Sequence, residues 1–193
     1  AWLVWVLSQQ ITPEGLFRVL IGLVSLAFAA WAFGLSQSRP RLLSSVMFLV
    51  GLAAAIGALA LPFSQRAADG TAVSPSSENL NAEPYSAARL AALRSEGRAV
   101  FVNLTAAWCV SCLYNERVAL SSKLVADEFK SSNTAYLVGD WTNQNPEISA
   151  LLKAHGREGV PLYLYYPEGG GKPKVLPQIL TELTIMETLG YTK

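Results

Sequence analysis

Two long apolar runs near the start of this 193-residue chain constrain its fold most strongly. Residues 16–35 contain one charged side chain, Arg18, and residues 42–62 contain none. A helix rises about 1.5 Å per residue, so roughly 20 residues cross the ~30 Å hydrocarbon core of a bilayer. Because lipid offers the backbone no hydrogen-bond partner, both runs are expected to be helices. The sequence therefore predicts a transmembrane α-helical hairpin; the alternative is a buried hairpin in a large soluble protein.

The residues around this hairpin indicate its context. Residues 1–10 are largely apolar and lack the initiator Met and basic region of a signal peptide, so we interpret them as the end of a truncated membrane helix of a longer protein. The loop between the two runs contains Arg39 and Arg41, and positive charge in short loops favours the cytoplasm. The rest of the chain is then expected on the opposite side of the membrane.

Charge divides the chain into two parts. Residues 1–65 carry four charged side chains, whereas the residues after Tyr85 carry eleven Lys or Arg and ten Asp or Glu. The net charge of +1 excludes the basic footprint of a nucleic-acid-binding protein and the composition of an acidic disordered chain. Between the two parts, residues 64–84 have no aromatic side chain and are rich in Ser, Ala, Asn and Pro. This segment is expected to be a flexible linker, either a functional tether or a plain spacer.

The remaining residues, 85–193, alternate between helical and strand patterns. Helices are expected at 86–96, 109–120, 123–129, 146–155 and 181–189, with Ser86 and Asn145 as N-caps. Strands are expected at 99–104, 135–138, 160–166 and 174–176, the last two joined by a turn at 169–171. This order predicts an α/β domain.

The two cysteines of the chain, Cys109 and Cys112, directly follow the strand at 99–104 and open a helix. In this position unpaired backbone N–H groups and the helix dipole stabilise a thiolate on Cys109, while Cys112 lies one turn later and can close a disulfide. The C-x-x-C spacing in this context predicts dithiol–disulfide exchange. The alternatives are a two-thiolate Cu(I) site, a static structural disulfide and a pair of inert buried thiols. His155, the one histidine, is far along the chain and is interpreted as a helix-end residue.

A second signal lies some fifty residues downstream, where Gly159, Val160 and Pro161 begin a strand. A proline at a strand start removes no required ladder donor. If its peptide bond is cis, the preceding backbone is free to pair with an extended partner chain across the cysteines.

Together these residues resemble a thioredoxin-fold domain. The stretch 100–112 (VFVNLTAAWCVSC), Asn115-Glu116 and Gly159-Val160-Pro161 resemble most closely the C-terminal periplasmic domain of the bacterial DsbD-type transmembrane thiol:disulfide reductases. The branch of that family linked to suppression of copper sensitivity fits equally well. The hairpin, linker and domain follow in the family's order, so the resemblance implies an α/β thioredoxin-like fold preceded by a transmembrane α-helical hairpin.

The resemblance also implies a function. Family members pass electrons from a membrane-embedded cysteine pair to this domain and on to periplasmic thiol–disulfide proteins, some of them in cytochrome c biogenesis. It implies a protein-disulfide reductase in the bacterial inner membrane, with this domain in the periplasm. The redox-active disulfide Cys109–Cys112 would act without metal or organic cofactor. Its partners would be the membrane-embedded redox domain of the same protein, periplasmic proteins and the lipid bilayer.

The resemblance assigns roles to individual residues. Cys109 would be the exposed nucleophile, Cys112 the resolving thiol and Pro161 a cis-proline, with Trp108, Val160 and Pro161 binding the substrate. Glu116 would exchange the proton of Cys112; the alternative is a solvated helix carboxylate. An oxidase or isomerase, or a Cu(I) chaperone, remains the alternative function.

Two departures from the family pattern bear on the site. Ala107 stands where many members have Asp, and Leu113 stands where Lys is frequent. Both remove charge near the cysteines and leave the reduction potential open.

Overall fold

The computed structural model describes residues 2–11, 13–36 and 80–190, together with six isolated positions between 46 and 57. The predicted run at 42–62 therefore lies largely outside the described residues, as does most of the linker at 64–84. The chain divides into two compact units, Ala1–Ala67 and Ala68–Lys193.

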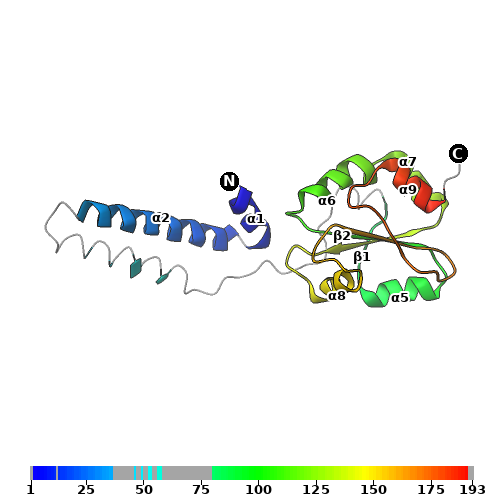
Figure 1. Ribbon diagram of the computed structural model, residues 1–193, viewed down its shortest axis with the longest axis horizontal. Helices are drawn as coiled ribbons and strands as arrows, with labels where there is room; N and C mark the ends of the chain where they lie inside the picture. Colours follow the sequence, from blue (N-terminus) through cyan, green and yellow to red (C-terminus); the bar gives the residue numbers. More distant parts are fainter. Residues whose placement is uncertain are drawn as a thin grey trace. The chain divides into compact units, whose positions relative to one another are not determined.

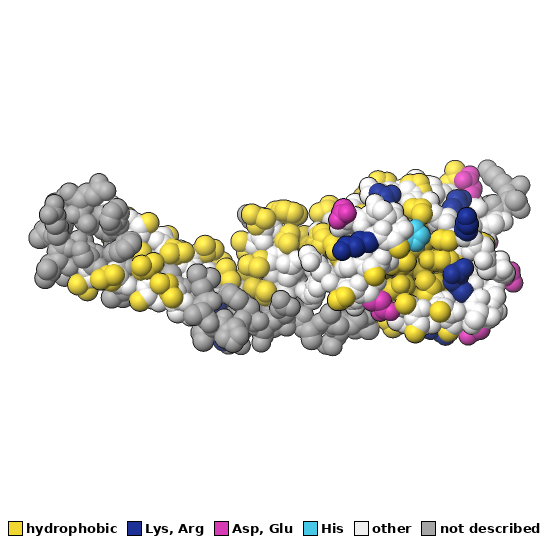
Figure 2. All heavy atoms as spheres, turned by 60° about the horizontal axis from the view of Figure 1, so that its bottom comes forward, with side chains coloured by type: hydrophobic (Ala, Val, Ile, Leu, Met, Phe, Trp, Pro, Cys, Tyr) yellow, Lys and Arg dark blue, Asp and Glu magenta, His cyan; other side chains and the backbone are white. Residues whose placement is uncertain are grey.

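The first unit contains the helices α1 (Trp2–Gln10) and α2 (Pro13–Ser36). The helix expected at 16–35 is thus confirmed, and Pro13 occupies its first position, where a missing N–H costs nothing. Large apolar side chains of both helices are exposed, including Trp2, Phe17, Val24 and Trp31. Charged side chains are instead concentrated on the second unit (Figure 2). Within the described residues, no helix combines the length and the apolar character that crossing a membrane requires.

The second unit is built on a five-stranded sheet in the order β1-β3-β2-β4-β5. The strands are β1 (Glu83–Pro84), β2 (Val100–Thr105), β3 (Ala135–Asp140), β4 (Leu162–Tyr166) and β5 (Lys174–Val175). Strands β1 and β2 run parallel to β3, whereas β4 runs antiparallel to both β2 and β5. Every residue of the central strand β2 is buried, which explains its mainly apolar, β-branched sequence; Asn103 and Thr105 are its two buried polar residues.

Helices cover both faces of this sheet (Figure 1). The helix α6 (Val110–Asn115), its continuation η1 (Glu116–Leu120), α7 (Lys123–Ser131) and α9 (Glu182–Leu189) lie on one face; α5 (Ala87–Ser95) and α8 (Pro146–Ala154) lie on the other. Alternate residues of β2 enter two separate cores. Phe101 packs with Phe129 and Tyr163 on the first face, and Val100 and Val102 pack with the second group of helices.

The helix ends follow the expected capping chemistry. Ser86 accepts the backbone N–H of Arg89, and Asn145 accepts those of Glu147 and Ile148, so both predicted N-caps are confirmed. Gly190, just after α9, has a φ of 100°, in the left-handed region.

Three details differ from expectation. The helix expected at 109–120 begins one residue later and widens at Glu116 into a π-helical turn, which sequence periodicity does not reveal. Strand β1 falls inside the segment expected to be linker; a two-residue edge strand that includes a proline has no alternating pattern to recognise. Strand β4 starts at Leu162, so Val160 and Pro161 form the loop that leads into it.

Candidate active site

A disulfide joins Cys109 to Cys112 where the chain leaves the carboxyl end of β2 and enters α6. The S–S distance is 2.06 Å and the two Cα atoms lie 5.2 Å apart. Cys109 is the N-cap of α6, and its Sγ accepts the backbone N–H of Cys112 at 3.2 Å. The hydroxyl of Ser111 lies 3.5 Å from the same sulfur. These groups are placed to stabilise negative charge on Cys109 once the disulfide is opened.

The two cysteines differ in exposure. Cys112 is fully buried at 0% exposure, whereas Cys109 retains 5%. The resemblance implied an exposed nucleophile, and in the oxidised state that exposure is much smaller than expected. The reason is local: Ala106, Trp108 and Val160 pack around the disulfide. Of the two cysteines, only Cys109 keeps a surface through which an incoming sulfur can approach.

The segment before β4 completes this apolar surround. The Val160–Pro161 peptide bond is cis, and Val160 packs against the disulfide cluster although it lies about fifty residues away in sequence. The indole of Trp108 also lies 6.0 Å, centroid to centroid, from that of Trp141. The structure therefore brings together four residues that the sequence predicted for this site: Trp108, Cys109, Cys112 and Val160.

Thr142, which the sequence did not single out, anchors the cysteine loop to the end of β3. Its hydroxyl accepts the backbone N–H of Ala107 at 2.8 Å and donates to a carboxylate oxygen of Asp140 at 2.5 Å. Its carbonyl accepts the indole N–H of Trp108 at 3.0 Å. Asp-x-Thr at the end of a strand is a recognisable turn pattern. That Thr142 bonds to Ala107 and Trp108, however, is visible only in the folded structure.

Glu116 lies in the interior, at 4% exposure, so the alternative of a solvated helix carboxylate is wrong. The Thr105 hydroxyl donates to its Oε1 at 3.1 Å, and the Glu116 backbone N–H donates to the carbonyl of Cys112. The carboxylate thus sits between the last residue of β2 and the helix that contains both cysteines. A buried carboxyl group can act as a general acid or base.

Asn115 is a second buried polar residue that the sequence did not mark as structural. Its amide N–H groups donate to the Tyr163 hydroxyl at 2.9 Å and to the Gln178 carbonyl at 2.7 Å. Its carbonyl oxygen accepts the backbone N–H of Leu180 at 3.0 Å. One side chain therefore ties the cysteine helix to β4 and to the segment before α9.

Tyr163 is almost completely buried, and burial raises the pKa of its hydroxyl to about 12. The hydrogen bond from Asn115 lowers this pKa, while the negative charge of Glu116 raises it, so desolvation dominates. The phenol remains protonated at every physiological pH and acts as a fixed hydrogen-bond partner.

We expect the free energy of unfolding to fall as the pH rises from about 10 to about 12. The unfolded chain ionises its tyrosines near pH 10, whereas folded Tyr163 retains its proton to about pH 12, so alkali favours the unfolded state. A shift of this size corresponds to at most about 3 kcal/mol. Urea unfolding at pH 9 and pH 11.5 measures the loss. Tyr163→Phe should lose clearly less stability over this interval, because it lacks the buried phenol. A smaller loss should remain, because the pKa of Tyr85 is also raised. An equal loss in both proteins would contradict the assignment.

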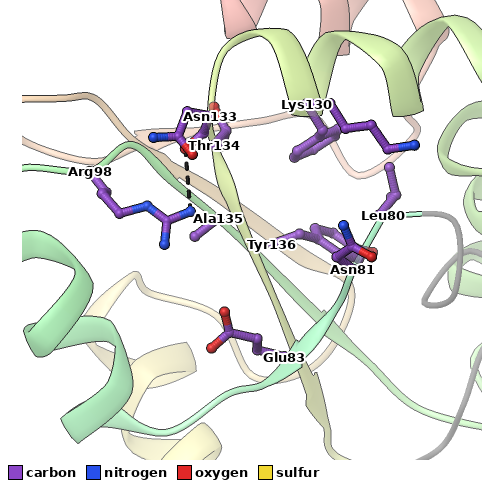
Figure 3. A pocket seen from close by; sticks show the side chains of 10 residues that line it. Leu80, Asn81, Glu83, Arg98, Lys130, Asn133, Thr134, Ala135 and Tyr136 are labelled. Carbon is purple, nitrogen blue, oxygen red and sulfur yellow. Dashed lines mark hydrogen bonds between the residues drawn. The ribbon is translucent and has the colours of Figure 1, made fainter.

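A pocket of about 270 Å³ lies at the opposite end of β2 from the disulfide (Figure 3). Arg98 and Glu83 line it, and an Arg98 guanidinium N–H donates to the Asn133 carbonyl at 3.5 Å. The pocket and the disulfide therefore lie at opposite ends of β2, and the pocket is not part of the site around the cysteines.

His155 lies at the C-cap of α8, where its backbone N–H donates to the Leu152 carbonyl at 3.0 Å, so its interpretation as a helix-end residue is confirmed. In the part of the chain that the structure describes, no group of three or more His, Cys, Asp or Glu side chains could hold a metal ion.

The sheet order, the helices on both faces and a disulfide at the start of α6 define the class of protein. The family model described as thioredoxin-like matches residues 81–167. The second unit therefore has a thioredoxin-like α/β fold.

Comparison with individual proteins is more specific. The chain is 30% identical over 158 residues to the "Thiol:disulfide interchange protein DsbD" of Yersinia pestis, covering 79% of the chain and 26% of that protein. It is 31% identical over 183 residues to "Thiol:disulfide interchange protein DsbD 1" of Pseudomonas aeruginosa, covering 86% and 31%. The chain is thus a homologue of proteins named DsbD, as the sequence indicated, and spans about a quarter to a third of their length.

Among solved structures, the chain is similar to the oxidised C-terminal domain of Neisseria meningitidis DsbD. The sequence identity is 24% and the TM-score 0.45, over 54% of this chain and 93% of that one.

Proposed function

We propose that this chain is a protein-disulfide reductase that receives electrons from a membrane-embedded cysteine pair and passes them to periplasmic proteins. The observation that supports this most directly is the position of Cys109. It caps a helix, its sulfur accepts a backbone N–H, and it alone of the two cysteines keeps an accessible surface. These features suit a sulfur that attacks a client disulfide when reduced and is attacked by a donor thiolate when oxidised.

The proposed reaction conserves atoms and electrons. In the reduced domain, the Cys109 thiolate attacks one sulfur of a client disulfide; a bond forms to that sulfur, and the client's second sulfur leaves as a thiolate. The Cys112 thiol then loses its proton and attacks the Cys109 sulfur, which releases the client's first sulfur. Two electrons have passed to the client, whose two thiolates take up protons from the solvent, and the disulfide seen in this structure has been restored. No metal or organic cofactor takes part.

Four further side chains have proposed roles. Glu116 accepts the proton of Cys112 during the second step, since it lies buried on the same helix and bonded to Thr105. Trp108 and Val160, which pack around the disulfide, together with Pro161, form the surface that binds the client chain.

The first unit is proposed to anchor the domain in the bacterial inner membrane. The apolar run at 16–35 and the exposed apolar side chains of α2 support this, since such surface is stable in contact with lipid. The domain would then face the periplasm, joined to its anchor by the linker expected at 64–84. Its electron donor would be a cysteine pair in another part of the same protein, and its clients would include cytochrome c biogenesis factors.

Trapping tests this proposal. In membranes from cells producing Cys112→Ser, we expect Cys109 to accumulate in mixed disulfides with partner proteins, visible as thiol-sensitive bands on non-reducing gels. Cys109→Ser, the matched control, should form none. The reduction potential of the unchanged domain should lie well below the value of about −120 mV of a strong oxidant. A potential near that value, or equal trapping by both variants, would contradict a reductase.

A further inference from the structure

The cysteine helix presents an exposed apolar stripe that begins beside the disulfide. Val110, Tyr114 and Val118 are 62%, 52% and 48% exposed and follow one another at intervals of four residues along α6 and η1. Residues spaced in this way lie above one another on one helix face. A solvent-facing helix surface normally has polar side chains at such positions, so the stripe needs an explanation.

A fourth exposed apolar side chain, Ile179, belongs to a segment that is bonded to the same helix. Ile179 is exposed and lies between Gln178 and Leu180, whose backbone groups both hydrogen-bond to Asn115 on α6. These two bonds hold Ile179 beside the helix. We call the surface formed by Val110, Tyr114, Val118 and Ile179 the α6 stripe.

The charge of this region is also unusual. Helix α6 has no charged side chain; on η1, Glu116 is buried and Arg117 is the first exposed charged residue after the disulfide. Charged groups in a partner placed over α6 would lose water without gaining an opposite charge, which disfavours them. The stripe therefore discriminates against charged partners as well as favouring apolar ones.

We infer that the α6 stripe binds the residues that flank the reactive cysteine of a partner protein, and that these residues are apolar and uncharged. The inference rests on the proposed function and extends it. Exchange brings a partner sulfur to bonding distance from Cys109, the residue immediately before Val110. The partner chain next to that sulfur must then cover the start of α6, so the stripe is continuous with the exchange surface.

A set of model substrates tests this inference. Three peptides, identical except that the cysteine is flanked by Leu, Asp or Lys, are each joined through a disulfide to 5-thio-2-nitrobenzoate and mixed with the reduced full chain. Release of the coloured thiolate gives the rate. We expect the Leu-flanked peptide to react about tenfold faster than the other two, a difference of about 1.4 kcal/mol in the barrier.

Matched variants locate the effect. Tyr114→Lys should lower the rate with the Leu-flanked peptide about fivefold, by removing apolar contact and adding a charge. It should leave the rate with the small disulfide of oxidised 2-mercaptoethanol unchanged. Val175→Lys makes a similar change at an exposed apolar residue of β5 and should alter neither rate.

The outcomes separate this inference from the proposed function. Equal rates with all three peptides would overturn the inference while leaving exchange intact. A Tyr114→Lys effect of the same size on the small disulfide would also overturn it, because the change would then act on the sulfur chemistry. Equal peptide rates together with Tyr114-dependent sedimentation on phospholipid vesicles would assign the stripe to a membrane instead. Failure to react with any disulfide would refute the proposed function itself.

Discussion

Replacement of Cys109 by serine is expected to abolish disulfide reduction by this chain. A serine hydroxyl is not ionised at neutral pH and cannot form the mixed disulfide, so the first step of exchange has no nucleophile. We expect the rate of insulin reduction by dithiothreitol to fall to that of dithiothreitol without the protein. The turbidity of precipitating insulin chains measures this rate.

Ser111→Ala is the matched control for this experiment. It removes a hydroxyl 3.5 Å from the Cys109 sulfur but leaves the backbone N–H of Cys112 in place. Loss of one weak contact is expected to change the rate by no more than about threefold, within the usual worth of such a bond. Substantial catalysis by Cys109→Ser would show that Cys112 acts as the nucleophile, against the burial seen here.

The largest change in stability is expected from Asn115→Leu. The leucine side chain has the same branched shape and number of non-hydrogen atoms, but it leaves the Tyr163 hydroxyl, the Gln178 carbonyl and the Leu180 N–H without their partner. Each unsatisfied buried group costs about 1–3 kcal/mol, so a loss of at least about 3 kcal/mol is expected. That is a large fraction of the ~5–15 kcal/mol by which domains are stable. Urea unfolding of the oxidised protein at pH 7 measures it.

Tyr163→Phe provides the comparison, because it removes one of the three hydrogen bonds and leaves the other two. Its cost should be about 1 kcal/mol. A loss in Asn115→Leu no greater than in Tyr163→Phe would show that the bonds to Gln178 and Leu180 contribute little to stability.

Much of the fold was predictable because local rules determine it. The strand expected at 99–104 is a mainly apolar, β-branched run, since it is buried on both faces, and the structure places β2 at Val100–Thr105. The caps at Ser86 and Asn145 satisfy backbone N–H groups of their own helices, so their chemistry is visible within three residues of sequence. The C-x-x-C pair could be predicted because its spacing and the strand before it are also local features of the sequence.

Other features could not be predicted in this way. Thr142 acts on Ala107 and Trp108 from 34 or 35 residues away, and Asn115 binds groups 48 to 65 residues away. Neither residue differs in type or spacing from ordinary loop or helix residues. The widening of the helix at Glu116 and the two-residue strand β1 likewise have no periodic signal.

The sequence by itself determined the chemistry: two thiols one helical turn apart, at the start of a helix that follows a buried strand. The tertiary structure decided how accessible each thiol is and what surrounds it. Trp108 and Val160 leave only Cys109 a surface, and Glu116 lies in the interior instead of in water. Chemical type and helical spacing are local properties of the chain, whereas burial and hydrogen-bond partners depend on segments that meet only when the sheet assembles.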